Sequence, residues 1–226
     1  MSTLQTTRSQ APWAADSGYL YNAAGETGPV ATLILAHGAG APMDSDFMDA
    51  MAARLATLGI AVVRFEFPYM AQRRLDGGKR PPNPQARLLA CWREVYEGVR
   101  RRVQGPLFIG GKSMGGRMAS LLVDDLGASG LVCLGYPFYA AGKPEKPRVA
   151  HLADLVTPTL IVQGERDALG NRQTVAGYKL SAHIELSWLA AADHDLKPLK
   201  ASGFTHEQHL DTAARHIHEF IQRQAV

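Results

Sequence analysis

Residues 106–117 read Pro-Leu-Phe-Ile-Gly-Gly-Lys-Ser-Met-Gly-Gly-Arg, and the fold prediction starts from this stretch. It opens with an apolar run at 106–111, which is typical of a buried strand, and a helical pattern follows at 114–125. Strands and helices in alternation are typical of a parallel sheet with helices on its faces. In such sheets the loops beyond the carboxyl ends of the strands carry function, so the turn between this strand and this helix is a candidate site.

The turn carries Gly111-Lys-Ser-Met-Gly115, a G-x-S-x-G motif with Ser113 at its centre. A serine on such a tight, strained turn needs neighbours two positions away that lack bulky side chains, which explains the two glycines. The turn exposes the hydroxyl at the start of a helix, where the backbone N–H of Met114 can face a developing oxyanion. The motif and its context predict that Ser113 is a nucleophile. The alternative is a tight turn with an incidental serine.

Buried strands and amphipathic helices alternate along the rest of the chain. Apolar runs predict further strands at 30–36, 60–67, 130–136, 157–164 and 184–189, and helical periodicity predicts helices over about 46–58 and 84–103 and at the C-terminus. This order predicts an α/β fold with a mostly parallel central sheet and helices on both faces. We expect a flexible N-terminal tail over residues 1–17 and a single domain over 18–226, with long loops at 69–83 and 137–148.

A serine hydroxyl needs a base to accept its proton and an acid to orient that base. In this fold class the three residues follow in the order serine, acid, histidine. Asp167 follows a buried strand and is the preferred acid, with Glu165 and Asp195 as alternatives; Asp167 could also be an ordinary loop carboxylate. His194 stands alone after the last predicted strand, where the base is expected.

The turn His37-Gly-Ala-Gly-Ala41, after the first predicted strand, is expected to supply a second donor to the oxyanion. A loop of small residues at this place can aim a backbone N–H at the reacting carbonyl. Ala39 is the first choice for this donor and Gly40 the second, and His37 is expected to shape the turn. Glycine here could also mean a tight turn alone.

Three patterns are rejected as cofactor or metal sites. A dinucleotide fingerprint that starts at Gly38 fails because its third glycine position is Met43. A phosphate-binding loop that ends at Ser113 fails because its first glycine position is Pro106. His206-Glu-Gln-His209 lacks the spacing of a zinc motif and is expected, like the other histidines of the last helix, on or near its polar side. We predict no cofactor and no metal.

The composition is that of an ordinary globular protein. Hydrophobic residues make up 46% of the 226 residues and charged residues 20%, which excludes an intrinsically disordered chain. The formal net charge of +3 is too small an excess for a broad nucleic-acid-binding face. The basic residues of the 69–83 loop are expected to form a solvated surface, namely Arg73, Arg74, Lys79 and Arg80.

The cysteines and the N-terminus bear on the compartment. Two cysteines, Cys91 and Cys133, suit neither a disulfide framework nor a metal site. The polar N-terminus lacks the apolar core of a signal peptide, and no apolar run approaches the ~20 residues of a membrane span. We therefore expect a cytoplasmic protein that binds neither nucleic acid nor membrane; the sequence leaves its oligomeric state open.

Several stretches carry a resemblance to a known family: Leu35-Ala-His-Gly-Ala-Gly-Ala-Pro-Met-Asp-Ser-Asp-Phe47, Gly110-Gly-Lys-Ser-Met-Gly-Gly-Arg117, Gly135-Tyr-Pro-Phe138 with Gly142-Lys-Pro144, and Gln163-Gly-Glu-Arg-Asp167. With them the chain resembles an α/β-hydrolase, and more narrowly the small Tex30/KANL3-like group, related to dienelactone hydrolases. The resemblance runs from about residue 30 to the end. It implies the strand order usual for that fold, shortened at its N-terminal edge.

By position, the resemblance implies Ser113 as nucleophile, Asp167 as acid and His194 as base, with the N–H groups of Met114 and Ala39 lining an oxyanion hole. It implies no substrate, because the group includes proteins thought to act as scaffolds. Dienelactone hydrolases carry a cysteine where this chain has Ser113, so their lactone specificity is not carried over.

The sequence thus predicts a serine hydrolase that acts on an ester or thioester through an acyl-enzyme. About twenty residues separate the strands at 130–136 and 157–164, too few for a large helical cap, so we expect an open site for a small or exposed acyl group. The alternative is a catalytically silent protein that uses the fold as an interaction platform.

Overall fold

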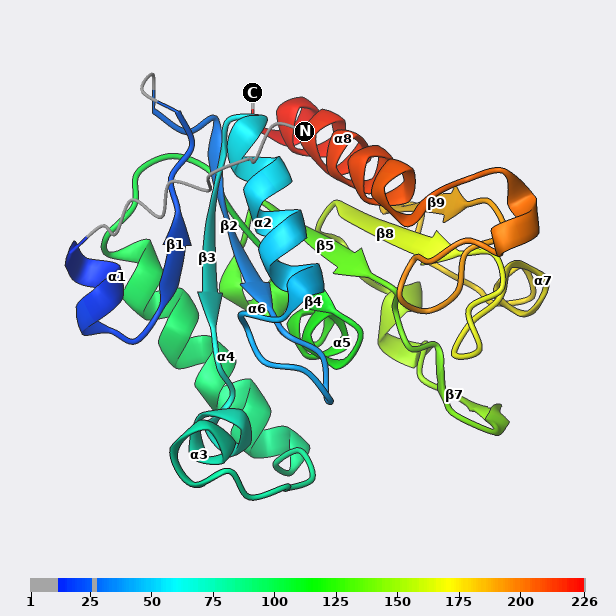
Figure 1. The fold of residues 1–226 in the computed structure, drawn as a ribbon, viewed down its shortest axis with the longest axis horizontal. Helices are drawn as coiled ribbons and strands as arrows, with labels where there is room; N and C mark the ends of the chain where they lie inside the picture. The colour runs from blue at the N-terminus through cyan, green and yellow to red at the C-terminus, as the bar shows by residue number, and fades with distance from the viewer. Residues whose placement is uncertain (1–11, 26–27, 226) are drawn as a thin grey trace.

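The computed structural model describes residues 12–25 and 28–225. Its centre is a seven-stranded sheet (Figure 1) whose strands lie in the spatial order β1 (Leu20–Asn22), β3 (Ile60–Phe65), β2 (Ala31–Ala36), β4 (Leu107–Lys112), β5 (Gly130–Leu134), β8 (Thr159–Gly164) and β9 (Ile184–Leu189). All neighbouring strands run parallel except β1, which pairs antiparallel with β3. The predicted mostly parallel sheet is confirmed.

Helices cover both faces of this sheet, as predicted (Figure 1). On one face lie α2 (Asp46–Thr57) and α8 (His206–Gln224); on the other lie α4 (Gln85–Arg100) and α5 (Met114–Ser120). Side chains alternate along a strand, so Leu33 and Leu35 of β2 pack with α2 and α8, while Ile34 between them packs with Trp92 of α4. Strands buried on both faces are therefore mostly apolar.

The other elements are short: α1 (Pro12–Asp16), α3 (Pro68–Asp76), the hairpin β6 (Tyr139–Ala140) with β7 (Lys143–Pro147), α6 (Val123–Leu126), α7 (Arg172–Val175), and the 3-10 helices η1 (Ala150–Ala153) and η2 (Lys200–Ser202). Only the hairpin and η1 lie between β5 and β8, so the predicted lack of a large cap is confirmed. Among the described residues, no helix has the length and apolarity needed to cross a membrane.

Several boundaries differ from the prediction. The expected loop over 69–83 begins as α3, because Pro68 occupies the first turn of a helix, where its missing N–H costs nothing, and because Tyr69 and Met70 bury their side chains. The predicted helix over 114–125 is two helices, α5 and α6. The expected loop over 137–148 contains the β6–β7 hairpin.

The structure describes only part of the segment predicted as a flexible N-terminal tail. Residues 12–16 form α1, Ala14 is buried and Trp13 packs against the core, so this part is not a loose tail. The flexible tail predicted over residues 1–11 lies outside the described residues. The single domain over 18–226 stays a prediction.

Candidate active site

Ser113 lies at the junction of β4 and α5, with backbone angles φ 50° and ψ −115°. A residue with a side chain rarely adopts such a positive φ, and a conformation of this kind persists only where the surrounding structure imposes it. The turn is thus strained at the residue that the motif predicts to be functional. It leaves Ser113 partly exposed beyond the carboxyl end of a central strand.

The two flanking glycines permit this turn. A Cβ on Gly111 would lie 2.7 Å from backbone atoms of Gly115 and Gly116, and a Cβ on Gly115 would lie 2.6 Å from the carbonyl oxygen of His37. Both distances are shorter than a carbon atom allows. Backbone therefore packs directly on backbone where β4, α5 and the turn after β2 meet, which is the physical reason for the spacing in G-x-S-x-G.

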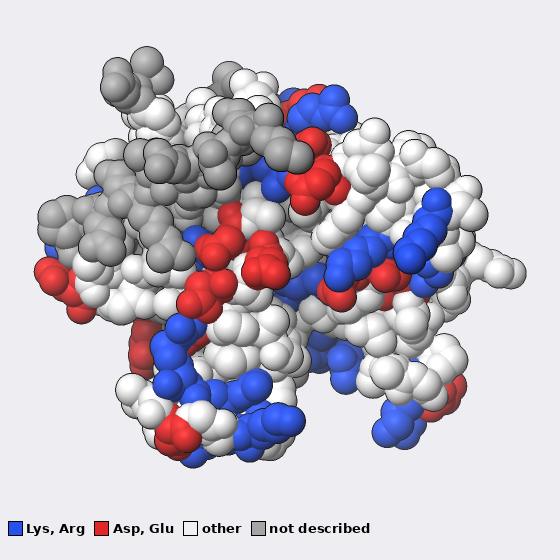
Figure 2. Space-filling view, viewed as in Figure 1, with Lys and Arg blue, Asp and Glu red and all other residues white. Residues whose placement is uncertain are grey.

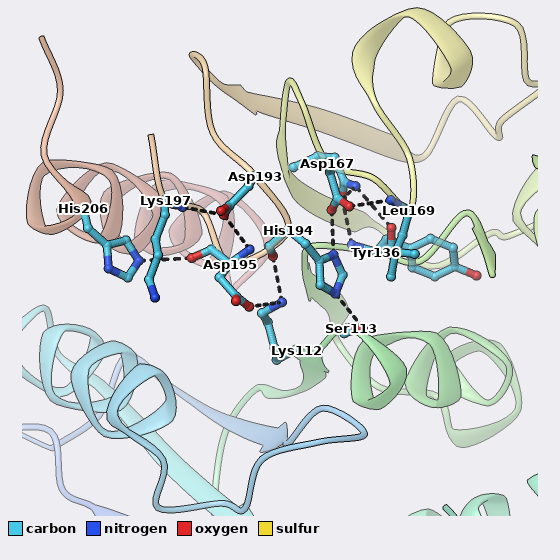
Figure 3. Close-up of polar contacts among 11 residues, drawn as sticks. Lys112, Ser113, Tyr136, Asp167, Leu169, Asp193, His194, Asp195, Lys197 and His206 are labelled. Atoms are coloured by element: carbon cyan, nitrogen blue, oxygen red, sulfur yellow. Dashed lines mark hydrogen bonds and ion pairs between the residues drawn. The ribbon is translucent and has the colours of Figure 1, made fainter. Parts of the chain in front are cut away.

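His194 joins Ser113 to Asp167 through one continuous line of hydrogen bonds (Figure 3). Its Nε2 lies 2.9 Å from Ser113 Oγ, and its Nδ1 lies 2.8 Å from Asp167 Oδ2. A carboxylate only accepts, so Nδ1–H donates to Asp167 and, in the neutral imidazole, Nε2 accepts from the serine hydroxyl. The side chain of Asp167 is fully buried and that of His194 is 26% exposed.

Buried donors hold the Asp167 carboxylate in place. Gln163 Nε2 donates to Oδ2 at 2.8 Å, and the backbone N–H of Leu169 donates to Oδ1 at 2.7 Å. Gln163 is itself fixed, because its Oε1 accepts from the N–H of Tyr136 and its Nε2 also faces the Gly170 carbonyl. No role was predicted for Gln163, whose only signal in the sequence is that of a polar residue inside an apolar strand.

The turn after β2 is organised by His37 and Tyr69. The buried His37 accepts from the N–H of Phe67 through Nε2, so its Nδ1–H donates to the Gly38 carbonyl at 2.6 Å. The hydroxyl of Tyr69 donates to the Ala39 carbonyl at 2.9 Å, and burial raises the pKa of Tyr69 to about 12, which keeps this donor protonated. His37 therefore shapes the turn, as expected.

These contacts leave two N–H groups free near the serine. In the described part of the chain, neither the N–H of Met114 nor that of Ala39 donates to another protein group. Met114 is the first residue of α5, where an N–H has no partner within the helix. Both groups are therefore available to donate a hydrogen bond to an outside acceptor, such as a negatively charged oxygen.

The alternative acids do not contact His194 through their side chains. Glu165 accepts from the N–H of Ala191 and pairs with Arg172. Asp195 pairs with the buried side chain of Lys112, for which no role was predicted. Across residues 12–25 and 28–225, no three His, Cys, Asp or Glu side chains gather as a metal-binding group.

The histidines of the last helix were predicted on or near its polar side, and this is wrong for His209. Its side chain is buried, and its Nδ1 lies 3.1 Å from the Leu196 carbonyl. His209 lies one position before Leu210, at the border of the apolar face, and the loop that carries His194 covers it. His206, at the exposed start of α8, contacts the Asp195 carbonyl.

The basic residues of the 69–83 segment gather over α3 and the loop after it (Figure 2). Arg74 pairs with Asp44 and Glu66, and Arg80 pairs with Asp76. Acidic neighbours thus neutralise part of the charge, which agrees with the expected solvated surface.

Residues 29–222 match the family described as "Alpha/beta hydrolase domain". The match covers most of the chain, and the protein belongs to this family. No curated protein matches the sequence.

Solved structures share the fold. An α/β serine hydrolase homologue from Coxiella burnetii is 18% identical with a TM-score of 0.66, covering 92% of this chain and 91% of its own. An α/β serine hydrolase without a lid from Xanthomonas campestris is 21% identical with a TM-score of 0.64, covering 88% of each chain. Est1E from Butyrivibrio proteoclasticus, solved with ferulic acid bound, is 16% identical with a TM-score of 0.68, covering 91% of this chain and 94% of its own.

Proposed function

We propose that the protein is a serine hydrolase that cleaves a carboxylic ester or thioester of a small or exposed acyl group. The observation that carries this proposal is the hydrogen-bonded line from Ser113 Oγ through His194 to the buried carboxylate of Asp167. This is the arrangement in which a histidine can accept the proton of a serine hydroxyl while a carboxylate fixes its tautomer.

In the proposed reaction Ser113 Oγ attacks the acyl carbon while its proton passes to His194 Nε2. The carbonyl oxygen becomes an oxyanion, which the N–H groups of Met114 and Ala39 stabilise; one such donor is typically worth about 2.7–4 kcal/mol. His194 then gives the proton to the departing alcohol or thiol, which leaves an acyl-Ser113 ester. Water, deprotonated by His194, attacks this ester and releases the acid and free Ser113.

The surroundings of Ser113 support a small or exposed acyl group. Only a two-stranded hairpin and one 3-10 turn lie between β5 and β8, and the imidazole of His194 is partly open to solvent. The motifs also support a place in the Tex30/KANL3-like group and a relation to dienelactone hydrolases; both stay proposals. The cytoplasmic location stays a prediction.

The test is labelling with a fluorophosphonate probe, followed by mass-spectrometric mapping of the labelled residue. The wild-type protein should be labelled at Ser113, and Ser113→Ala should not be labelled. A panel of short p-nitrophenyl esters and thioesters then separates the two ester classes. Folded wild-type protein that is neither labelled nor active on any member of the panel would favour the interaction platform instead.

A further inference from the structure

Lys112 is the last residue of β4 and immediately precedes Ser113. Only 9% of its side chain is exposed, although lysine rarely buries its ammonium group without a partner. Burial lowers the pKa of Lys112, and the nearby carboxylate of Asp195 acts in the opposite direction. The contacts of this ammonium group therefore have to compensate for the loss of water.

Those contacts reach the loop that carries His194 (Figure 3). Lys112 Nζ donates to the backbone carbonyl of His194 at 2.7 Å and pairs with Asp195 Oδ1 at 3.2 Å. The same ammonium group lies 5.6 Å from the centre of the Phe47 ring, which favours a cation. Lys112, the neighbour of Ser113 in the chain, thus holds the backbone of His194, whose side chain hydrogen-bonds to Ser113.

The space around this contact is closely filled. A Cβ on Gly135 would lie 2.8 Å from the His194 carbonyl oxygen and 3.3 Å from Lys112 Nζ. The loop itself is tightly wound, since Ala191 and Leu196 both have positive φ angles of 54° and 61°. A loop under such strain needs contacts outside itself to keep one conformation.

We propose that Lys112 is a positioning residue, which ties the His194 loop to the nucleophile strand and so keeps His194 Nε2 within hydrogen-bond distance of Ser113 Oγ. The inference rests on the proposed function for its effect on catalysis. The proposed placement of the His194 imidazole applies to the protein without substrate as well.

The experiment compares Lys112→Met with Lys197→Met. Methionine keeps a long apolar side chain but removes the ammonium group. Lys197 is an exposed lysine of the same loop, so its replacement removes the same charge without the buried contact. We expect Lys112→Met to lower kcat about 10- to 100-fold on a p-nitrophenyl ester with little change in KM, because a displacement of about 1 Å in a catalytic group costs that much. Lys197→Met should stay within about threefold of the wild-type kcat.

Asp195→Asn provides a second variant, because Asp195 is exposed and its replacement should not prevent folding. It weakens the same contact from the other side and should lower kcat about 3- to 10-fold. The double variant Lys112→Met/Asp195→Asn removes both charges. If Lys112 positions His194, the double variant should regain thermal stability that a single variant has lost, but it should not regain kcat.

A readout without substrate separates this proposal from the proposed function. The proton between His194 Nδ1 and Asp167 should give a low-field ¹H NMR signal, assigned by its absence in His194→Ala. We expect the signal to broaden or disappear in Lys112→Met and to persist in Lys197→Met, whether or not the wild-type protein turns over an ester. Unchanged kcat and an unchanged signal in both Lys112→Met and Asp195→Asn would overturn the proposal, as would recovery of kcat in the double variant.

Discussion

Replacement of Asp167 by asparagine tests the role of the buried carboxylate at almost constant shape. Both oxygens of Asp167 accept from donors: Oδ1 from the N–H of Leu169, and Oδ2 from Gln163 Nε2 and His194 Nδ1. Asparagine offers one oxygen and one NH₂ group. In either orientation of the amide, its NH₂ group meets at least one of these donors.

His194 can relieve this conflict by moving its proton. With the amide oxygen toward Leu169, the NH₂ group faces Nδ1, which then accepts a hydrogen bond while the proton sits on Nε2. Nε2–H would then point at Ser113 Oγ and could not take its proton. In a serine protease the same change lowers kcat about 10⁴-fold for this reason. We expect a loss of about 10³- to 10⁴-fold here, or about 4–5.5 kcal/mol of transition-state stabilisation.

The amide also remains opposed to Gln163 Nε2, which should lower the free energy of unfolding by about 1–3 kcal/mol. The assay is kcat/KM on the best p-nitrophenyl ester, with urea denaturation measured in parallel. The matched control is Glu165→Gln, the neighbouring carboxylate, which keeps an oxygen that can accept from the N–H of Ala191 and should leave kcat within about threefold. A folded Asp167→Asn that retains more than a tenth of the activity would refute the assignment of Asp167 as the orienting acid.

Three further predictions concern the surroundings of the site. In Gly115→Ala the new Cβ would lie 2.6 Å from the His37 carbonyl oxygen, so we expect about 1–3 kcal/mol lower free energy of unfolding in urea and a loss of fluorophosphonate labelling; wild-type labelling would contradict the account of the turn. Tyr69→Phe removes the hydrogen bond to the Ala39 carbonyl and should lower kcat about fivefold with KM unchanged; a change in KM alone would count against a role in the oxyanion turn. Burial lowers the pKa of His151 from 6.5 to about 4. Between these pH values the imidazole is protonated in the unfolded chain and neutral in the folded protein, so the free energy of unfolding decreases as the pH falls. Because His151 is partly exposed, we reduce the expected effect: His151→Gln should remove about 1 kcal/mol of the difference in stability between pH 7 and pH 5, measured from urea midpoints. An equal pH dependence in both proteins would contradict this.

The sequence predicts the tight turn around Ser113 because every requirement of that turn is local. Two glycines, the strand before them and the helix after them lie within about a dozen residues, and the steric reason for each glycine can be stated without a fold. The placement of Asp167 and His194 follows from one further rule, that parallel strands end at the same edge of the sheet. The structure brings their side chains into the predicted contact, while their catalytic roles await the experiments above.

The features that sequence reasoning missed depend on distant partners. Helix α3 is rich in arginine and was predicted as a loop; only the fold shows that Tyr69 and Met70 at its start are covered. Strand β1 is three residues long, and its pairing with β3 is what makes this segment a strand. Gln163 and Lys112 gave no local signal beyond that of a polar residue at the end of an apolar strand, because the role of a buried polar side chain depends on the groups that it contacts.

The place of Lys112 in the motif gives a geometric reason for its contact. Gly111 faces α5, since a Cβ there would meet Gly115 and Gly116, so the next side chain along β4 points to the opposite face of the sheet. That is the face of α2 and α8, where the ammonium group of Lys112 lies over the ring of Phe47 in α2. The loop from β9 into α8 returns to the same face and carries His194. A side chain at the position before the nucleophile therefore reaches the backbone of the histidine loop, although the G-x-S-x-G pattern leaves that position unspecified.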